Sequence, residues 1–277
     1  MVAEGESVRM PAVAGSFYPA QPDQLRTSVE RFLVRTLEPL TPWAVIVPHA
    51  GYIYSGSTAG KTYACVDLPK RLIILCPNHT GVGARLASIS DGQWHTPLGD
   101  VPVDGDLARR LAAACPAMED DPLAHRREHA IEVQLPFLQV LLGEFTFLPV
   151  VVGTTALGEL ESLGLAMAKA MTECRERVAI VVSSDMNHYE DARTNRAKDT
   201  AALEAVLRMD PGGLFDAVHE RHISMCGYAP AVAALFACRE LGADQAEVVD
   251  YTDSGMVTGD DTEVVSYAGV RIFKGQP

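Results

Sequence analysis

Residues 44–56 read AVIVPHAGYIYSG, and this stretch opens with four apolar residues that are followed by a proline and His49. The same order returns at residues 71–81, RLIILCPNHTG, where a second apolar run ends in a proline and His79 comes two residues later. Short continuous apolar runs bounded by turn residues are typical of strands that a parallel sheet buries on both faces. Two buried strands are therefore predicted to end in a loop that carries a histidine.

A third apolar run lies in VAIVVSSDMNHY, residues 178–189, and is likewise followed by polar residues that include Asp185 and His188. In open α/β sheets, ligands bind outside the carboxyl ends of the strands, where loops from several strands converge. We therefore expect the three histidine-bearing loops to open on one edge of the sheet, provided that their strands run parallel and lie close together.

Apolar strand-like runs alternate with helical patterns along the whole chain, which favours an α/β fold with a central, mostly parallel sheet flanked by helices. The strand-like runs lie near residues 44–48, 71–76, 146–152, 178–183, 246–251 and 263–273. Helices are predicted for residues 23–38, 56–66, 105–115, 129–143, 156–174, 195–209 and 227–241. No repeat, low-complexity tract or flexible linker divides the chain, so we expect residues 1–277 to form a single domain.

The composition argues against several classes of partner. The 277 residues carry a formal net charge of -13 and a pI near 5.0, whereas nucleic acids and anionic membranes need a concentrated basic face. The first residues hold no apolar core of signal-peptide length, and no later run reaches the ~20 apolar residues of a membrane span. We therefore expect a cytoplasmic protein with no nucleic-acid partner and no membrane partner.

The six cysteines form no CxxC pair, and a chain of this length does not depend on a disulfide framework. We expect reduced thiols, most of them serving as small buried hydrophobic residues. Cys226 differs because it comes just before a predicted helix. A helix N-terminus lowers the pKa of a thiol and favours the thiolate, which is the form that binds metals.

Further candidate groups lie in REHAIEVQLPF, residues 127–137. His129 and Glu132 are three residues apart and would share a face of the predicted helix, where they could serve as ligand and orienting group or as acid and base. The carboxyl groups that we expect within reach of the histidines are those of Asp185, Glu128 and Glu132.

Each of these features also has a purely structural interpretation. A histidine at a strand end can cap a loop, Cys226 can pack as a small residue, and Glu132 can cap a helix or form a salt bridge. The remaining histidines are interpreted as surface or packing residues: His95, His125, His219 and His222. Histidine is nevertheless the commonest protein ligand for Fe, Cu and Zn, so the repeated strand endings favour a metal site with His49 and His79 as its first two ligands.

The sequence resembles the Memo family, whose microbial members are also called AmmeMemoRadiSam system protein B. The resemblance runs in order over essentially the whole chain. It is carried by AGSFYPA at 14–20, VPHAGYIYSG at 47–56, CPNHTG at 76–81, HTPLGDVPVD at 95–104, EHAIEVQLPFLQ at 128–139, SSDMNHY at 183–189, MCGYAP at 225–230 and TGDDTEVVSYAGV at 258–270.

The resemblance implies a fold similar to that of the class III extradiol dioxygenases, which bind non-haem Fe(II) through two histidines and a carboxylate. On that basis His49 and His79 match the metal-binding histidines and His188 matches the acid/base histidine. Cys226 stands where the dioxygenases have their third ligand, a glutamate. A thiolate there would favour Cu(I) or Zn more than a carboxylate does, so Fe(II) is the first expectation and Cu or Zn are the alternatives. Asp185 or Glu132 could still supply an oxygen ligand.

Two functions follow from the resemblance. The first is a metal-dependent oxidoreductase, dioxygenase-like, with the metal on His49, His79 and Cys226. In it His188, Asp185, Glu132 and His129 are the catalytic candidates. The second is a non-catalytic protein that uses the same pocket to bind a small molecule or a peptide, because a shared fold does not carry an activity with it. The microbial family name further implies AMMECR-type and radical-SAM pathway partners.

Overall fold

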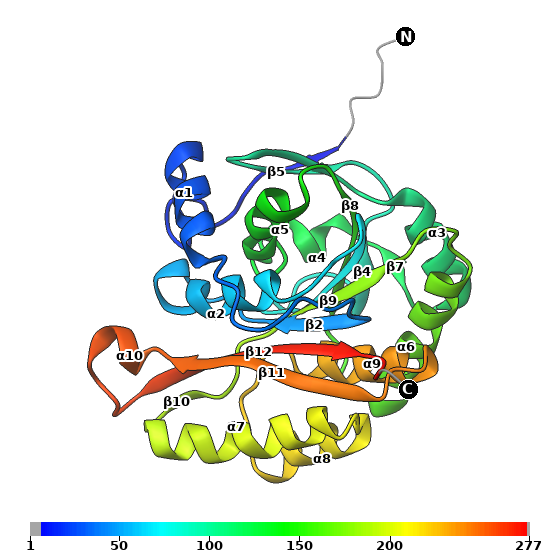
Figure 1. Cartoon of the computed structure of the whole chain (residues 1–277). Helices are drawn as coiled ribbons and strands as arrows, with labels where there is room; N and C mark the ends of the chain where they lie inside the picture. Colours follow the sequence, from blue (N-terminus) through cyan, green and yellow to red (C-terminus); the bar gives the residue numbers. More distant parts are fainter. Residues whose placement is uncertain (1–6, 276–277) are drawn as a thin grey trace.

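The computed structural model describes residues 7–275, and Figure 1 shows helices packed on both faces of a central sheet. Four parallel strands form the middle of this sheet in the order β2, β9, β3 and β8. They span Ala44–Val47, Ala179–Ser183, Arg71–Pro77 and Thr146–Val152. All four are almost entirely apolar because helices cover both of their faces. The predicted α/β fold with helices on both faces of a central sheet is confirmed; the sheet is parallel in its middle and mixed as a whole.

Further strands, most of them paired antiparallel, complete the sheet at its edges. On one side β12 (Val264–Phe273) pairs with β2 and also with β10 (His188–Glu190) and β11 (Gln245–Asp253). On the other side β4 (Leu86–Ser88) pairs with β8 and carries β7 (Glu119–Asp120). A second, three-stranded sheet consists of β1 (Val8–Arg9), β5 (Gln93–Thr96) and β6 (Gly99–Pro102).

Two hydrophobic cores lie on the two faces of the central sheet, and successive residues of a strand enter them alternately. One core is built with α3 (Gly105–Ala114), α6 (Leu157–Thr172), α7 (Ala192–Leu207), α8 (Pro211–Glu220) and α9 (Tyr228–Glu240). The other uses α1 (Pro22–Phe32), α2 (Tyr52–Ala64), α4 (Pro122–Arg126), the 3-10 turn η1 (Glu132–Gln134) and α5 (Leu135–Leu142). The short helix α10 (Gly255–Thr258) follows β11. Within residues 7–275, none of the helices has the length and apolar character needed to cross a membrane.

The helix predicted for residues 23–38 ends at Phe32, so the prediction was wrong over its last six residues. The backbone of Phe32 packs directly on α2, where a Cβ atom on Gly60 would overlap the carbonyl oxygen of Phe32. The chain then leaves the helix, and the backbone N–H groups of Thr36 and Leu37 donate to the sulfur of Cys65 at 3.4 and 3.3 Å. Tertiary contacts with α2 therefore override the helical pattern of the sequence.

His125 on α4 is a packing residue, as the sequence indicated. Its ring is fully buried and lies edge-on against Trp94, with 5.8 Å between the ring centroids. Neither ring nitrogen has a hydrogen-bond partner among the described residues. Burial, reinforced by the nearby Arg9 guanidinium, lowers the pKa of His125 from 6.5 to about 4. The fold therefore holds this ring in its neutral form.

We expect Gly60→Ala to lower the free energy of unfolding by about 1–3 kcal/mol, because the added methyl group forces Phe32 away from α2. Gly158→Ala is the matched control: Gly158 lies in α6, and a Cβ there meets no atom within 4 Å. That substitution should raise the stability by about 0.4–1 kcal/mol. Urea denaturation of both variants measures the difference, and equal effects would contradict the close approach of Phe32.

Between pH 6.5 and about pH 4 the unfolded chain binds a proton at His125 that the folded chain does not. The free energy of unfolding is therefore unaffected by this residue above pH 6.5. It falls as the pH drops below that value, and His125 accounts for about 3 kcal/mol of the fall. His125→Phe should remove that part of the pH dependence, whereas His219→Asn, at an exposed ring, should keep it. Denaturant midpoints measured across this range test the assignment, and parallel profiles for wild type and His125→Phe would refute it.

Candidate metal centre

Three histidine rings converge at the carboxyl edge of the central sheet. His49 follows β2, His79 follows β3, and His129 lies in the turn before η1. One ring nitrogen from each lies within 4.8 Å of those of the other two. The ring centroid of His49 is 5.1 Å from that of His79 and 5.5 Å from that of His129, and the rings of His79 and His129 stack at 4.9 Å. We call these residues the three-histidine cluster.

A single buried carboxylate supports two members of the cluster. Glu128 accepts hydrogen bonds from the backbone N–H of His79 at 2.7 Å and from its ring Nδ1 at 2.9 Å, and its Oε1 lies 3.5 Å from Nδ1 of His129. Burial alone would raise the pKa of Glu128, but the hydrogen bonds and charge of His79 outweigh it and hold that pKa at about 2. Because the carboxylate only accepts, Nδ1 of His79 carries the proton and Nε2 is free to bind a metal.

His49 lies at the back of the cluster with only 2% of its surface exposed. Burial and the neighbouring rings of His79 and His129 lower the pKa of His49 well below its usual value, so the ring is neutral. Its Nδ1 lies 2.9 Å from the hydroxyl of Ser183, the last residue of β9. A neutral imidazole with one nitrogen engaged in this way is the form that coordinates metals.

His129 is half-buried, with 22% of its side chain exposed. Burial lowers the pKa of His129 as well, and the ring of Phe17 packs edge-on against it at a centroid distance of 4.9 Å. His129 precedes the first helical turn, because η1 begins only at Glu132. The predicted helix over residues 129–143 was therefore wrong at its start, and His129 and Glu132 do not share a helix face.

Glu132 points away from the cluster and anchors the amino-terminal segment. Its two oxygens accept hydrogen bonds from Arg9 at 2.5 Å, from the backbone N–H groups of Ala12 and Val13 at 2.8 and 3.0 Å, and from the hydroxyl of Tyr18 at 2.7 Å. All of these donors lie in residues 9–18, which also carry Phe17 to His129. Glu132 thus holds the segment that covers the cluster.

Cys226 lies against the cluster with its thiol protonated. Its sulfur is 3.4 Å from Nε2 of His49 and accepts a hydrogen bond from the backbone N–H of Asp185 at 3.2 Å. Burial, reinforced by the Asp185 carboxylate, raises the pKa of the Cys226 thiol far above its usual value. The expected thiolate was therefore wrong for the metal-free protein: Cys226 precedes the N-cap of α9, but the cost of burying a charge exceeds the effect of the helix end.

Asp185 lies on the same side of His49 as Cys226. Its Oδ1 accepts the backbone N–H groups of His49 and Ala50 at 2.7 and 3.2 Å, which leaves Oδ2 4.0 Å from Nε2 of His49. Burial raises the pKa of Asp185. A carboxyl group in this position can supply an oxygen ligand or share a proton with its neighbours.

His188 stands beside these groups at the start of β10. Its backbone N–H and ring Nδ1 lie 2.8 and 2.9 Å from the hydroxyl and the carbonyl oxygen of Ser224. Because a carbonyl only accepts, Nδ1 donates and Nε2 is left to take or give a proton. Ser224 precedes Cys226 by two residues, so His188 is held by the segment that also carries Cys226. Tyr189 follows it in the left-handed region, with φ of 58° and an exposed ring.

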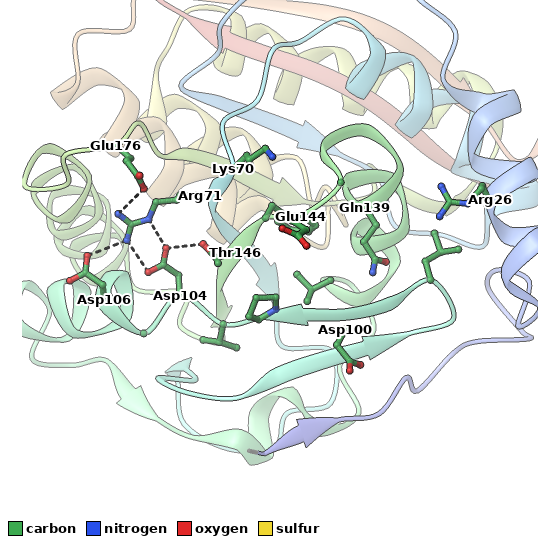
Figure 2. A pocket seen from close by; sticks show the side chains of 17 residues that line it. Arg26, Lys70, Arg71, Asp100, Asp104, Asp106, Gln139, Glu144, Thr146 and Glu176 are labelled. Atoms are coloured by element: carbon green, nitrogen blue, oxygen red, sulfur yellow. Dashed lines mark hydrogen bonds and ion pairs between the residues drawn. The ribbon is translucent and has the colours of Figure 1, made fainter. Parts of the chain in front are cut away.

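A cavity of about 990 Å³ lies at the opposite edge of the sheet, at the amino ends of β3 and β8. Figure 2 shows that Arg71 forms its wall through two hydrogen bonds to Asp104 and one to Asp106. The hydroxyl of Thr146 also donates to Asp104, and none of the three-histidine cluster lines this cavity. This cavity therefore lies away from the three-histidine cluster.

Comparison with known proteins places the chain in a family. The family model for Memo-like proteins matches residues 9–271. A MEMO1 family protein of Methanopyrus kandleri is 38% identical and aligns with 96% of this chain and 99% of its own length, and one of Aquifex aeolicus is 40% identical over 95% and 98%. The crystal structure of an uncharacterized protein of Escherichia coli K12 shares the fold, with a TM-score of 0.54 and 11% identity over 81% of this chain and 98% of that one. This chain belongs to the Memo-like protein family.

Proposed function

We propose that the three-histidine cluster holds one metal ion, with Fe(II) as the first candidate. We further propose that the protein is a metal-dependent oxidoreductase that acts on a small molecule. The observation that carries the proposal is the convergence of three ring nitrogens within 4.8 Å at the carboxyl edge of the sheet. Imidazole nitrogens suit Fe, Cu and Zn, and a set of two or three with open positions is common in catalytic sites.

The charge state of the cluster fits a cation. The lowered pKa values of His49 and His129 keep both rings neutral, and Glu128 supplies one negative charge directly behind His79 and His129. A carboxylate behind a metal-binding histidine orients the ring and makes its other nitrogen more basic. A metal bound here would serve as a Lewis acid and redox centre.

The surrounding side chains supply proton chemistry. His188 offers Nε2 as a proton acceptor and donor, because its Nδ1 is held by the carbonyl of Ser224. Asp185, whose pKa is raised by burial, offers Oδ2 as a second site for a proton or as an oxygen ligand. Phe17 and the segment anchored by Glu132 restrict the access of water to the cluster.

Cys226 is proposed as a fourth metal ligand that coordinates after losing its proton. Its sulfur already lies 3.4 Å from Nε2 of His49, the nitrogen that would face the metal. Metal binding must displace the thiol proton, since only the thiolate coordinates. His49 and His129 bind a metal without releasing a proton, because their lowered pKa values keep both rings neutral beforehand. The difference in proton release between wild type and a variant without the thiol therefore shows whether Cys226 coordinates.

We expect metal-depleted wild-type protein to take up about one Fe(II) or Zn per chain and to release the proton of the Cys226 thiol as it does so. Cys226→Ala should bind more weakly and release about one proton fewer than wild type, while His49→Ala and His129→Ala should lose stoichiometric binding. His95→Ala, at a partly exposed ring paired with Asp100, is the matched control and should bind as wild type does. Elemental mass spectrometry and an indicator dye under anaerobic conditions give both numbers. Wild-type protein that takes up no metal would reject the proposal.

The oxidoreductase part has its own test. We expect the Fe(II)-loaded protein to consume oxygen in the presence of ascorbate, and His188→Ala to retain the metal but consume oxygen at least about 100-fold more slowly, as for the loss of a general acid or base. An oxygen electrode measures the rate. Equal rates for His188→Ala and wild type would remove His188 from the chemistry, and a metal-loaded protein without oxygen uptake would leave a binding role for the pocket.

A further inference from the structure

A chain of buried hydrogen bonds runs from the interior of the protein to the back of His49. The hydroxyl of Tyr63 donates to Oε1 of Gln134 at 2.8 Å, and Nε2 of Gln134 donates to the hydroxyl of Ser183 at 2.8 Å. The same hydroxyl lies 2.9 Å from Nδ1 of His49. Tyr63, Gln134 and Ser183 are all fully buried, so the polar atoms of their side chains need partners within the protein.

Two backbone carbonyl groups fix the direction of every bond in the chain. Nε2 of Gln134 lies 3.0 Å from the carbonyl oxygen of Pro48, which can only accept, so the amide nitrogen must occupy that position. The hydroxyl of Ser183 lies 2.7 Å from the carbonyl oxygen of Ala130 and donates its only proton there. Toward its two other neighbours, Gln134 and His49, the Ser183 oxygen is therefore an acceptor.

It follows that Nδ1 of His49 donates to Ser183, and that Nε2 of His49 carries a bare lone pair. The thiol of Cys226, 3.4 Å from this Nε2, fits as its donor. The opposite tautomer has a competing partner, because Oδ2 of Asp185 lies 4.0 Å from the same Nε2 and could accept its proton. The choice between the two tautomers therefore depends on the hydroxyl of Ser183.

We propose that Ser183 and Gln134 are positioning residues that select the Nδ1-protonated tautomer of His49 and so aim its Nε2 lone pair into the three-histidine cluster. The inference rests on the metal site proposed above, which it deepens. It also separates the roles of two ligands, because His79 is oriented by the anionic Glu128 whereas His49 is oriented by a neutral hydroxyl and amide.

The test uses metal-free full-length protein carrying isotope-labelled histidine. Long-range proton–nitrogen correlation spectra identify the protonated ring nitrogen, and the His49 signals are assigned by their absence from His49→Asn. We expect Nδ1 of His49 to carry the proton in wild type. In Ser183→Ala the donor loses its acceptor in a dry interior, so the proton should move to Nε2. Ser183→Thr keeps a hydroxyl and should restore the wild-type tautomer.

Ser55→Ala is the matched control, since Ser55 is an equally buried serine whose hydroxyl donates to a carbonyl, that of Ala50, and contacts no histidine ring. It should leave the spectrum of His49 unchanged. In a metal titration, Ser183→Ala should bind Fe(II) or Zn about 10–100-fold more weakly than wild type, and Ser183→Thr should recover that loss.

A His49 that is protonated at Nε2 in wild type, or that keeps its Nδ1 proton in Ser183→Ala, would overturn the inference. The measurement on wild type needs no metal, and the only variant it uses is His49→Asn, for the assignment. A protein that shows the expected tautomer but takes up no metal would refute the proposed metal site and leave the tautomer assignment standing, so the two failures are distinguishable.

Discussion

The register between β2 and β9 is the constraint on which the site depends. Val47 pairs with Ser183, so the last residue of β9 lies beside the turn that carries His49. The side chain of Ser183 points to the same face of the sheet as Val181 and Val47, which belong to the core that also contains Tyr63. A slip of one residue would turn Ser183 to the opposite face and leave the His49 ring without its acceptor.

The second organising feature is the way in which the buried carboxylates near the three-histidine cluster are neutralised. Two carboxylates four residues apart, Glu128 and Glu132, are both fully buried, yet they serve different parts of the protein. Glu128 neutralises the back of the histidine cluster, whereas Glu132 is matched by Arg9 and ties down the amino-terminal segment. Buried charges of this kind are stable only when their hydrogen bonds are complete. The turn at residues 128–132 therefore links the covering segment and the ligand shell in one rigid unit.

The sequence predicted the positions that depend on buried strands. His49 and His79 could be found because an apolar run identifies a strand and the carboxyl ends of parallel strands meet at one edge. The role of Ser183 could not be predicted, since it follows from three atoms contributed by segments far apart in the chain: Gln134, Ala130 and His49. The prediction of a thiolate at Cys226 was wrong for a related reason. The sequence shows that a helix begins there, but it does not show that the thiol is buried away from water. The predicted end of the first helix was wrong because the hydrophobic pattern of the sequence does not show that Phe32 packs against Gly60.

The contrast between the two edges of the sheet bears on where function resides. The cavity at the amino edge has a large volume, but the charge of Arg71 in its wall is satisfied by Asp104 and Asp106 within the protein itself. The carboxyl edge offers the reverse: Nε2 of His79 and Oδ2 of Asp185 have no hydrogen-bond partner among the described residues, although the groups on either side of them are tightly held. A metal or substrate requires side chains that the protein holds through one polar atom while a second polar atom has no partner within the protein. Convergence of such atoms, more than empty volume, is the reason for proposing the function at this edge.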